Sequence, residues 1–203
     1  MIWVFAEDTD PHADMVIHVL ESRGSEVLRI NPERLDERLC ELSYGLNADG
    51  QIEGHLTYLK RQADLADVEA VFCRNYYFQF AEDSEEKNAD DLLIAKELKA
   101  AFISLCECLD CKWVNAPWDT KVDFRRREGD LKMEECELPD ELTDKIMRLM
   151  QHFHLNFGAL DFAVDKEGRF WFLEINAEGN WLWMESELEL PICAAISNQL
   201  LAT

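Results

Sequence analysis

The side chains best suited to chemistry are two carboxylates and one amide near the end of the chain. Glu174 and Asn176 lie two positions apart in a stretch whose apolar residues predict a strand, so they share one of its faces. A turn over residues 165–168 would pair this strand with the preceding one, placing Asp161 opposite Phe172 and diagonal to Glu174, at about 7 Å. Two carboxylates and an amide oxygen on one sheet face suit Mg²⁺, a cation that also bridges phosphates.

Three arginines bear on how this site is interpreted. Arg125 and Arg126 belong to the one basic cluster of an acidic chain, and an ordinary ion pair between Glu174 and either of them is the alternative to a metal site. A planar guanidinium suits bidentate contact with phosphate, so Arg125 is also a candidate to bind the oxygens of a phosphoryl group or an acyl phosphate. Arg74 follows a short apolar stretch, at the strand end where α/β sheets place ligands, and a surface cation is the alternative.

The first half of the chain has the pattern of a parallel α/β sheet. A buried strand, a helix with apolar residues at helical spacing and a second strand follow one another with short connections. An Asp-Gly turn between two alternating stretches predicts a hairpin, and a later strand, a long helix and another strand complete this half. The predicted ranges are strands at 2–6, 26–30, 42–46, 52–56, 70–73 and 111–115 and helices at 11–23 and 85–109.

The second half carries an antiparallel pattern. Pro139 starts an amphipathic helix that runs to about residue 154. Two strands, at 157–165 and 169–177, flank a short turn, and a helix spans roughly 191–201. The candidate metal ligands therefore fall on the two paired strands.

Composition restricts the partners. The 203 residues include 42 acidic and 20 basic side chains, for a formal net charge of −22. Nucleic acid requires clustered lysines and arginines that replace phosphate counterions, and an anionic membrane surface makes a similar demand, so we expect neither partner. With 48% hydrophobic and 10% aromatic residues, the chain has enough apolar material for a packed core.

The sequence predicts a cytoplasmic protein. No apolar run approaches the roughly 20 residues of a bilayer span, and residues 1–8 lack a basic segment and turn acidic, unlike a signal peptide. Seven cysteines, an odd number scattered among predicted helices and strands, indicate reduced thiols. The cluster of Cys106, Cys108 and Cys111 lacks the partner motif of a zinc site, so we interpret it as buried thiols, with metal ligation as the alternative.

Several segments carry a family resemblance. Leu155 to Asp161 and Gly168 to Trp181 resemble the C-terminal signature of ATP-grasp ligases, in which an Asp, a Glu and an Asn two positions further bind Mg²⁺. The residues that follow are similar to the microviridin-type peptide ligases. The first half resembles the pre-ATP-grasp domain of those enzymes in its opening strand, its Asp-Gly hairpin, Arg74 and the Asn115-Ala116-Pro117 motif. Asp123-Phe124-Arg125 resembles the Asp-Trp-Arg segment of the same family.

This resemblance implies an α/β fold in two parts. A Rossmann-like pre-ATP-grasp domain would occupy 1–117, and a truncated ATP-grasp C-terminal subdomain with antiparallel strands would occupy 118–203. Where the family has a long central segment that includes the lid subdomain, only Trp118 to Val122 remain. The resemblance also implies ATP and Mg²⁺ as cofactors and a peptide as substrate. It implies metal ligation by Asp161, Glu174 and Asn176, nucleotide contacts by Arg74, Arg125 and Asn176, and a catalytic role for Arg125.

The expected activity is that of an ATP-grasp ligase, which activates a carboxylate as an acyl phosphate and joins it to an amine or hydroxyl. The missing segment makes a degenerate ligase one outcome. Two alternatives stay open: a non-catalytic module, derived from the ligase, that binds a peptide or protein, and an internally deleted or engineered miniature. The short joint is expected to expose apolar surface and favour self-association, which the net charge opposes. The candidates for exposure are Trp118, Phe124, Trp181 and Trp183, although a place in the core is the favoured interpretation of the last two.

Overall fold

The computed structural model describes residues 1–35, 39–49, 51–74, 89–116 and 134–202. In this part of the chain, four short apolar strands form a parallel sheet of order β2-β1-β6-β7. Ile2 of β1 is the register partner of Val27 on one side and of Ala70 on the other. The predicted parallel α/β sheet is confirmed. Its strands are β1 Ile2–Phe5, β2 Val27–Ile30, β6 Ala70–Cys73 and β7 Lys112–Val114.

One face of this sheet packs against α2 (Ala89–Cys108) and against a second, antiparallel sheet of order β3-β4-β5. Trp3 and Phe5 point to this side, because side chains alternate along a strand, and the ring centroids of Phe5 and Phe102 lie 5.3 Å apart. The sequence does not predict β5, a short and largely exposed strand without apolar alternation. The strands of the second sheet are β3 Cys40–Leu46, β4 Ile52–Tyr58 and β5 Arg61–Asp64.

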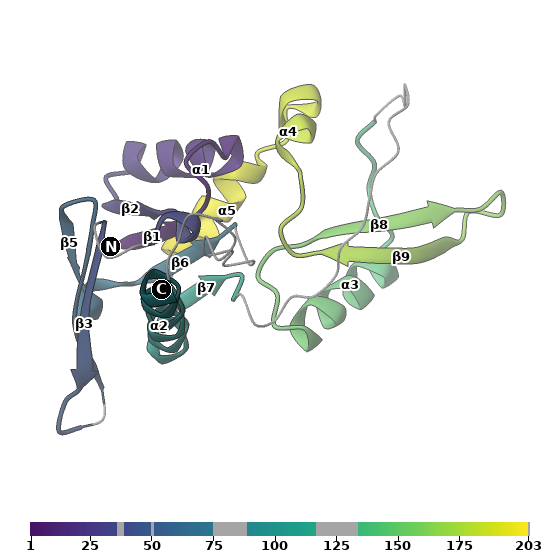
Figure 1. Ribbon diagram of the computed structural model, residues 1–203. Helices are drawn as coiled ribbons and strands as arrows, with labels where there is room; N and C mark the ends of the chain where they lie inside the picture. Colours follow the sequence, from purple (N-terminus) through teal and green to yellow (C-terminus); the bar gives the residue numbers. More distant parts are fainter. Residues whose placement is uncertain (36–38, 50, 75–88, 117–133, 203) are drawn as a thin grey trace.

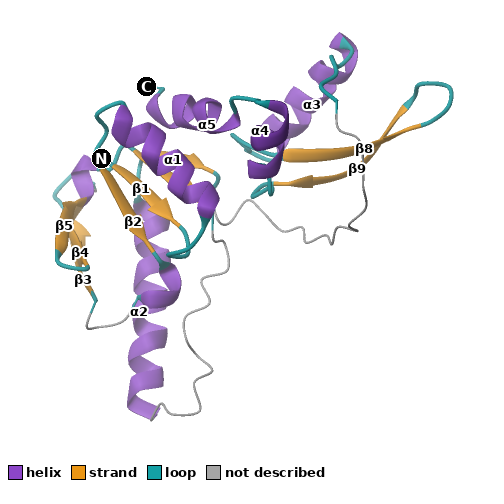
Figure 2. Cartoon of the chain, turned by 90° about the horizontal axis from the view of Figure 1, so that it is seen from above, coloured by secondary structure: helices purple, strands orange, loops and turns teal. Residues whose placement is uncertain are grey.

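The opposite face is covered by α1 (Pro11–Ser22) and α5 (Ile192–Leu201), which lie side by side in both views (Figures 1 and 2). Ile2 and Val4 point to this side and form a core with apolar residues of both helices. The last helix of the chain therefore packs beside the first.

The predicted antiparallel C-terminal strands are also confirmed. β8 (Ala159–Val164) and β9 (Phe170–Asn176) form a hairpin that projects away from the parallel sheet, with α3 (Asp140–His152) along it (Figure 1). A short helix, α4 (Leu182–Leu188), connects the hairpin to α5. α4 was not predicted from the sequence, because a helix of only seven residues is too short to show a clear helical spacing of apolar residues.

The hairpin carries several exposed apolar side chains. Trp171 and Leu173 are 55% and 61% exposed. Trp181 is 1% exposed and belongs to the core under α1 and α5, so the core interpretation holds and Trp181 is excluded as a candidate for exposure. Trp183 is half-buried. Outside the described residues lie Trp118 and Phe124.

None of the seven cysteines, all of which lie in the described part of the chain, forms a disulfide. Burial raises the pKa of Cys106, and it raises the pKa of Cys111 to about 12, so both stay protonated at neutral pH. No helix among the described residues is long and apolar enough to cross a membrane.

Candidate functional site

The two carboxylates predicted to bind metal face each other across the hairpin. Asp161 on β8 is the direct register partner of Glu174 on β9. The expectation that Asp161 lies opposite Phe172 is wrong, because Phe172 pairs with Phe162 and the register then shifts, leaving Leu173 as the extra residue of a β-bulge. A bulge re-aims the side chains of its strand. With regular pairing, Leu173 would oppose Asp161 and Glu174 would point to the other face.

Direct opposition brings two like charges together. Desolvation, followed by the charge of Asp161 and a hydrogen bond with it, raises the pKa of Glu174 above its ordinary value. Like charges on opposed positions destabilise a strand pair, and a divalent cation between the carboxylates would remove that repulsion. Asp161 and Glu174 therefore fit a hard cation such as Mg²⁺.

The third predicted ligand, Asn176, is engaged in the turn that follows β9. Its Oδ1 accepts hydrogen bonds from the backbone N–H groups of Glu178, at 2.9 Å, and Gly179, at 3.0 Å. These bonds use both lone pairs of the amide oxygen, so Asn176 could bind a metal only if at least one of the two hydrogen bonds broke. Its role as a metal ligand stays a prediction. Among the described residues, no group of three or more His, Cys, Asp or Glu side chains could hold a metal ion.

Arg74 lies at the carboxyl end of β6, as predicted, but its 9% exposure excludes the surface-cation alternative. Its Nε donates to Oδ2 of Asp10 at 3.1 Å. Its Nη1 donates to the backbone oxygens of Glu178 and Gly179, the latter at 3.1 Å. Arg74 therefore ties the start of α1 to the turn after β9, and its contact with a nucleotide stays a prediction.

Asp10 is the ionic partner of Arg74, a pairing that the sequence did not predict. Its Oδ1 caps α1 by accepting from the backbone N–H groups of His12, at 2.8 Å, and Ala13, at 3.3 Å. Burial raises the pKa of Asp10, but the charge of Arg74 and the hydrogen bonds outweigh burial and bring the pKa below 3.8. Burial and then the charge of Arg74 lower the pKa of His12, whose ring packs edge-on against Trp181 at 5.0 Å between centroids. The signal in the sequence was an acid in the first β-to-α loop, at the same sheet edge as Arg74.

Asn115 is a second residue to which the sequence analysis gave no role. It directly follows β7 and is 1% exposed. Its Nδ2 donates to the backbone oxygens of Phe157, at 2.8 Å, and Ala177, at 3.0 Å. Its Oδ1 accepts from the backbone N–H groups of Asn156, at 2.7 Å, and Phe157, at 3.1 Å. An asparagine between a buried strand and Ala-Pro is the signal that could have identified it.

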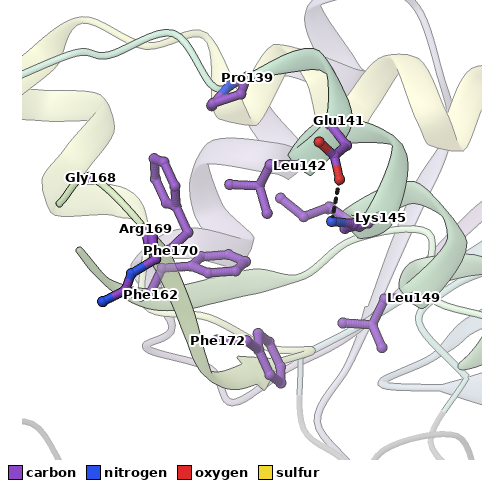
Figure 3. A pocket seen from close by; sticks show the side chains of 11 residues that line it. Pro139, Glu141, Leu142, Lys145, Leu149, Phe162, Gly168, Arg169, Phe170 and Phe172 are labelled. Carbon is purple, nitrogen blue, oxygen red and sulfur yellow. Dashed lines mark hydrogen bonds and ion pairs between the residues drawn. The ribbon is translucent and has the colours of Figure 1, made fainter. Parts of the chain in front are cut away.

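The other face of the hairpin carries an apolar cavity of about 640 Å³, between the hairpin and α3. Figure 3 shows aromatic rings from the hairpin and aliphatic side chains from α3 around this cavity, with the 2.6 Å ion pair of Glu141 and Lys145 on the helix. A cavity of this size suits a small apolar ligand or a few side chains of a peptide. The apolar lining residues are Phe162, Phe170, Phe172, Leu142, Ile146 and Leu149.

Arg125, predicted to be catalytic and to contact phosphate, lies outside the described residues. The same holds for Arg126, its neighbour in the basic cluster, and for the short joint at Trp118 to Val122. The role of Arg125, the ion pair proposed as the alternative and the loss of the lid subdomain stay predictions.

No family model and no curated protein matches the sequence of the chain. Solved structures match it along nearly its whole length. The macrocyclase MdnC of Microcystis aeruginosa MRC, bound with the precursor peptide MdnA, has a TM-score of 0.80 at 15% identity, covering 100% of this chain and 99% of MdnC. A RiPP-associated ATP-grasp ligase of Chryseobacterium gregarium, in complex with ADP and a leader and core peptide, has a TM-score of 0.77 at 16% identity, with 98% and 96% covered.

A third similar structure is the ATP-grasp ligase PsnB complexed with a minimal precursor, Mg and ADP. Its TM-score is 0.73 at 16% identity, covering 98% of this chain and 96% of PsnB. Identities this low establish the fold. The chain has the fold of these ATP-grasp ligases and macrocyclases, which is the fold that its sequence resemblance implied.

Proposed function

We propose that the chain is an ATP-grasp-type ligase that uses Mg²⁺ and ATP to modify a peptide through an acyl phosphate. The observation that carries this proposal is the direct opposition of Asp161 and Glu174 on an outward face of the hairpin. The similar structures with bound ADP, one of them with Mg, and those with bound precursor peptides support the choice of cofactors and substrate class.

In this proposal Asp161 and Glu174 hold Mg²⁺, and Asn176 joins them if its oxygen leaves the turn. When bound, the ion would offset the negative charge of phosphoryl oxygens, where most of the acceleration of phosphoryl transfer arises from positioning and electrostatics. Arg125 would contact the same oxygens. Arg74 would act near the nucleotide mainly by holding the turn after β9, because three of its hydrogen bonds are already made within the chain.

Isothermal titration of the full chain with Mg·ATP tests this function. We expect saturable heat with a dissociation constant between micromolar and millimolar, and none for Glu174→Gln. Glu187→Gln, an exposed acid on α4, is the matched control and should bind as the native chain does. A native chain that gives no heat at millimolar Mg·ATP would contradict the ligase function.

A second candidate is a non-catalytic peptide-binding module, which the apolar cavity beside α3 favours. This face of the hairpin lies opposite the carboxylate pair, so peptide binding there would not need Mg²⁺. A displayed random-peptide library, panned in EDTA against the native chain, would then yield peptides with apolar residues. Their binding should be lost in Ile146→Asp, which places a charge in the cavity, and retained in Glu174→Gln.

A further inference from the structure

One buried side chain at the end of β7, Asn115, bonds to both chain segments at the base of the β8–β9 hairpin. Asn115 makes four hydrogen bonds, and all four go to backbone groups at the two ends of the hairpin. Phe157 precedes β8 and Ala177 follows β9, so the amide of Asn115 joins the segment that enters the hairpin to the segment that leaves it. Asn156 adds a bond in the reverse direction, from its Nδ2 to the backbone oxygen of Trp113 on β7, at 2.8 Å.

Apart from these bonds, those of Arg74 to the turn after β9 and the side chains of α3 beside it, the described chain offers the hairpin few contacts that fix its direction. Among the described elements, β8 and β9 make extensive contacts only with each other, and they project from the body of the molecule (Figures 1 and 2). Asp161 lies four residues beyond Phe157, or about 13 Å along the strand. A small rotation of the hairpin about its base therefore displaces the two carboxylates further than it displaces the base itself.

From these contacts we infer that Asn115 is a positioning residue that sets where Asp161 and Glu174 stand relative to the parallel sheet. The part of this inference that concerns metal binding rests on the proposed function, whereas the part that concerns the position of the hairpin follows from the hydrogen bonds alone. Asn115 touches neither carboxylate. It acts through the paired strand ends, so its loss should loosen the hairpin while the parallel sheet stays folded.

Two substitutions at this position separate its donor and acceptor functions. Asn115→Asp keeps the oxygen that accepts from Asn156 and Phe157, but it places a second oxygen against the carbonyl groups of Phe157 and Ala177. Asn115→Ser keeps one small polar group and serves as the second variant if the buried carboxylate prevents folding. Asn31→Ala is the matched control. Like Asn115, Asn31 is a buried asparagine, 5% exposed, that directly follows the carboxyl end of a strand of the parallel sheet. Its strand, β2, lies on the opposite side of that sheet from β7.

Hydrogen exchange followed by mass spectrometry gives the first readout. In either Asn115 variant, the protection of amides in β8 and β9 should fall about tenfold relative to the native chain, while that of β1, β2 and β6 stays unchanged. Asn31→Ala should not lower protection selectively in the hairpin. Equal loss in hairpin and sheet, or unchanged protection of the hairpin, would overturn the inference.

Mg²⁺ affinity, measured by titration of the full chain, gives the second readout. We expect it to fall about tenfold in the Asn115 variants, as for other residues that orient metal ligands without touching the metal, and to stay unchanged in Asn31→Ala. An Asn115 variant with loosened strands and native Mg²⁺ affinity would overturn the positioning role. A native chain that binds no Mg²⁺ would instead overturn the proposed function, and the exchange comparison would still decide whether Asn115 fixes the hairpin.

Discussion

Replacing Glu174 with glutamine tests the carboxylate pair at the level of one side chain. The pKa of Glu174 is raised by desolvation and then by Asp161, so the folded state disfavours the ionised form. The resulting destabilisation is absent in acid, develops as the pH rises through the unfolded and then the folded pKa, and is complete above both. At neutral pH without metal, Glu174→Gln should raise the melting temperature by roughly 1–3 °C, and it should abolish any Mg²⁺-dependent shift.

The measurement is calorimetry in EDTA and in Mg²⁺, with Glu187→Gln as the control. Removing any acid from a chain of net charge −22 reduces self-repulsion, and Glu187→Gln measures that general effect. The advantage of Glu174→Gln over this control should shrink as the pH falls toward 4.5, the ordinary pKa of the group. A destabilised Glu174→Gln that retains the Mg²⁺ response would show that the pair is structural.

Arg74 permits a second test at this scale, because its removal leaves Asp10 buried without its cation. In the native chain the lowered pKa of Asp10 contributes stability that is present above its unfolded pKa and is lost as the pH falls through the folded pKa. Arg74→Met should destabilise the chain by roughly 3 kcal/mol at neutral pH, and the deficit should shrink in acid. Urea unfolding across this pH range measures it.

Lys145→Met is the comparison for Arg74→Met. It breaks the exposed ion pair of Lys145 with Glu141 on α3, which should change stability little. An Arg74→Met variant as stable as Lys145→Met would mean that Arg74 is not needed to hold the turn after β9, and the arginine would then be available for a nucleotide.

At the level of the elements, the turn after β9 is constrained by its neighbours. Gly179 adopts a φ of +43°, and a Cβ at this position would lie 2.9 Å from the Cβ of Ala159. Gly179→Ala should therefore destabilise the chain by roughly 2–3 kcal/mol, combining backbone strain with the clash. Gly24→Ala, at a φ of +83° with open space around it, should cost only about 1 kcal/mol. The free energy of unfolding of both variants is measured by chemical denaturation. If Gly179→Ala and Gly24→Ala lower it equally, Ala159 and the turn can move apart freely.

The elements with a strong local pattern were predictable from the sequence. The strand at 2–6, the helix at 11–23 and the paired strands near the end all occur within two residues of their predicted limits or closer. Each has a run of apolar residues or a helical spacing bounded by a turn. β5 was missed because a short edge strand needs no apolar pattern: only Ala63 is buried in it.

The register of β8–β9 was not predictable from the sequence. Residue types and strand parity placed Asp161 and Glu174 near each other on paired strands, but they did not reveal the bulge at Leu173 that makes the two residues direct partners, and metal binding by the pair stays a prediction. The roles of Asn115 and Arg74 at those ends involve partners 41 to 105 residues away. Contacts at such separation leave no periodic signal in one sequence.

On the scale of the whole molecule, the two ends of the chain are interleaved. α5 packs beside α1 on the parallel sheet, and Trp181 shares a core with Ile2 and Val4 of the first strand. The hairpin emerges between these packed segments and is fastened at its base by Asn115 and Arg74. This arrangement combines a hydrogen-bonded base with a hairpin that is exposed beyond it.

The hairpin leads us to expect salt-dependent self-association. Val164, Trp171, Phe172 and Leu173 are between 48% and 61% exposed, and no further strand of the described chain pairs with β8 or β9. A net charge of −22 opposes contact between copies, and the Debye length falls from about 30 Å at 0.01 M salt to about 8 Å at 0.15 M. We therefore expect a monomer at low salt and a dimer at high salt, detected by sedimentation velocity.

Leu173→Ser should shift this association toward the monomer, because it removes an apolar side chain that is 61% exposed without changing the net charge. The control is Leu46→Ser, at a position 68% exposed on β3, in the other antiparallel sheet. If the hairpin is the contact, the control associates as the native chain does, because it removes similar apolar area elsewhere. A native monomer at both salt concentrations would exclude self-association, and equal effects of the two substitutions would show that general hydrophobicity, rather than the hairpin, drives it.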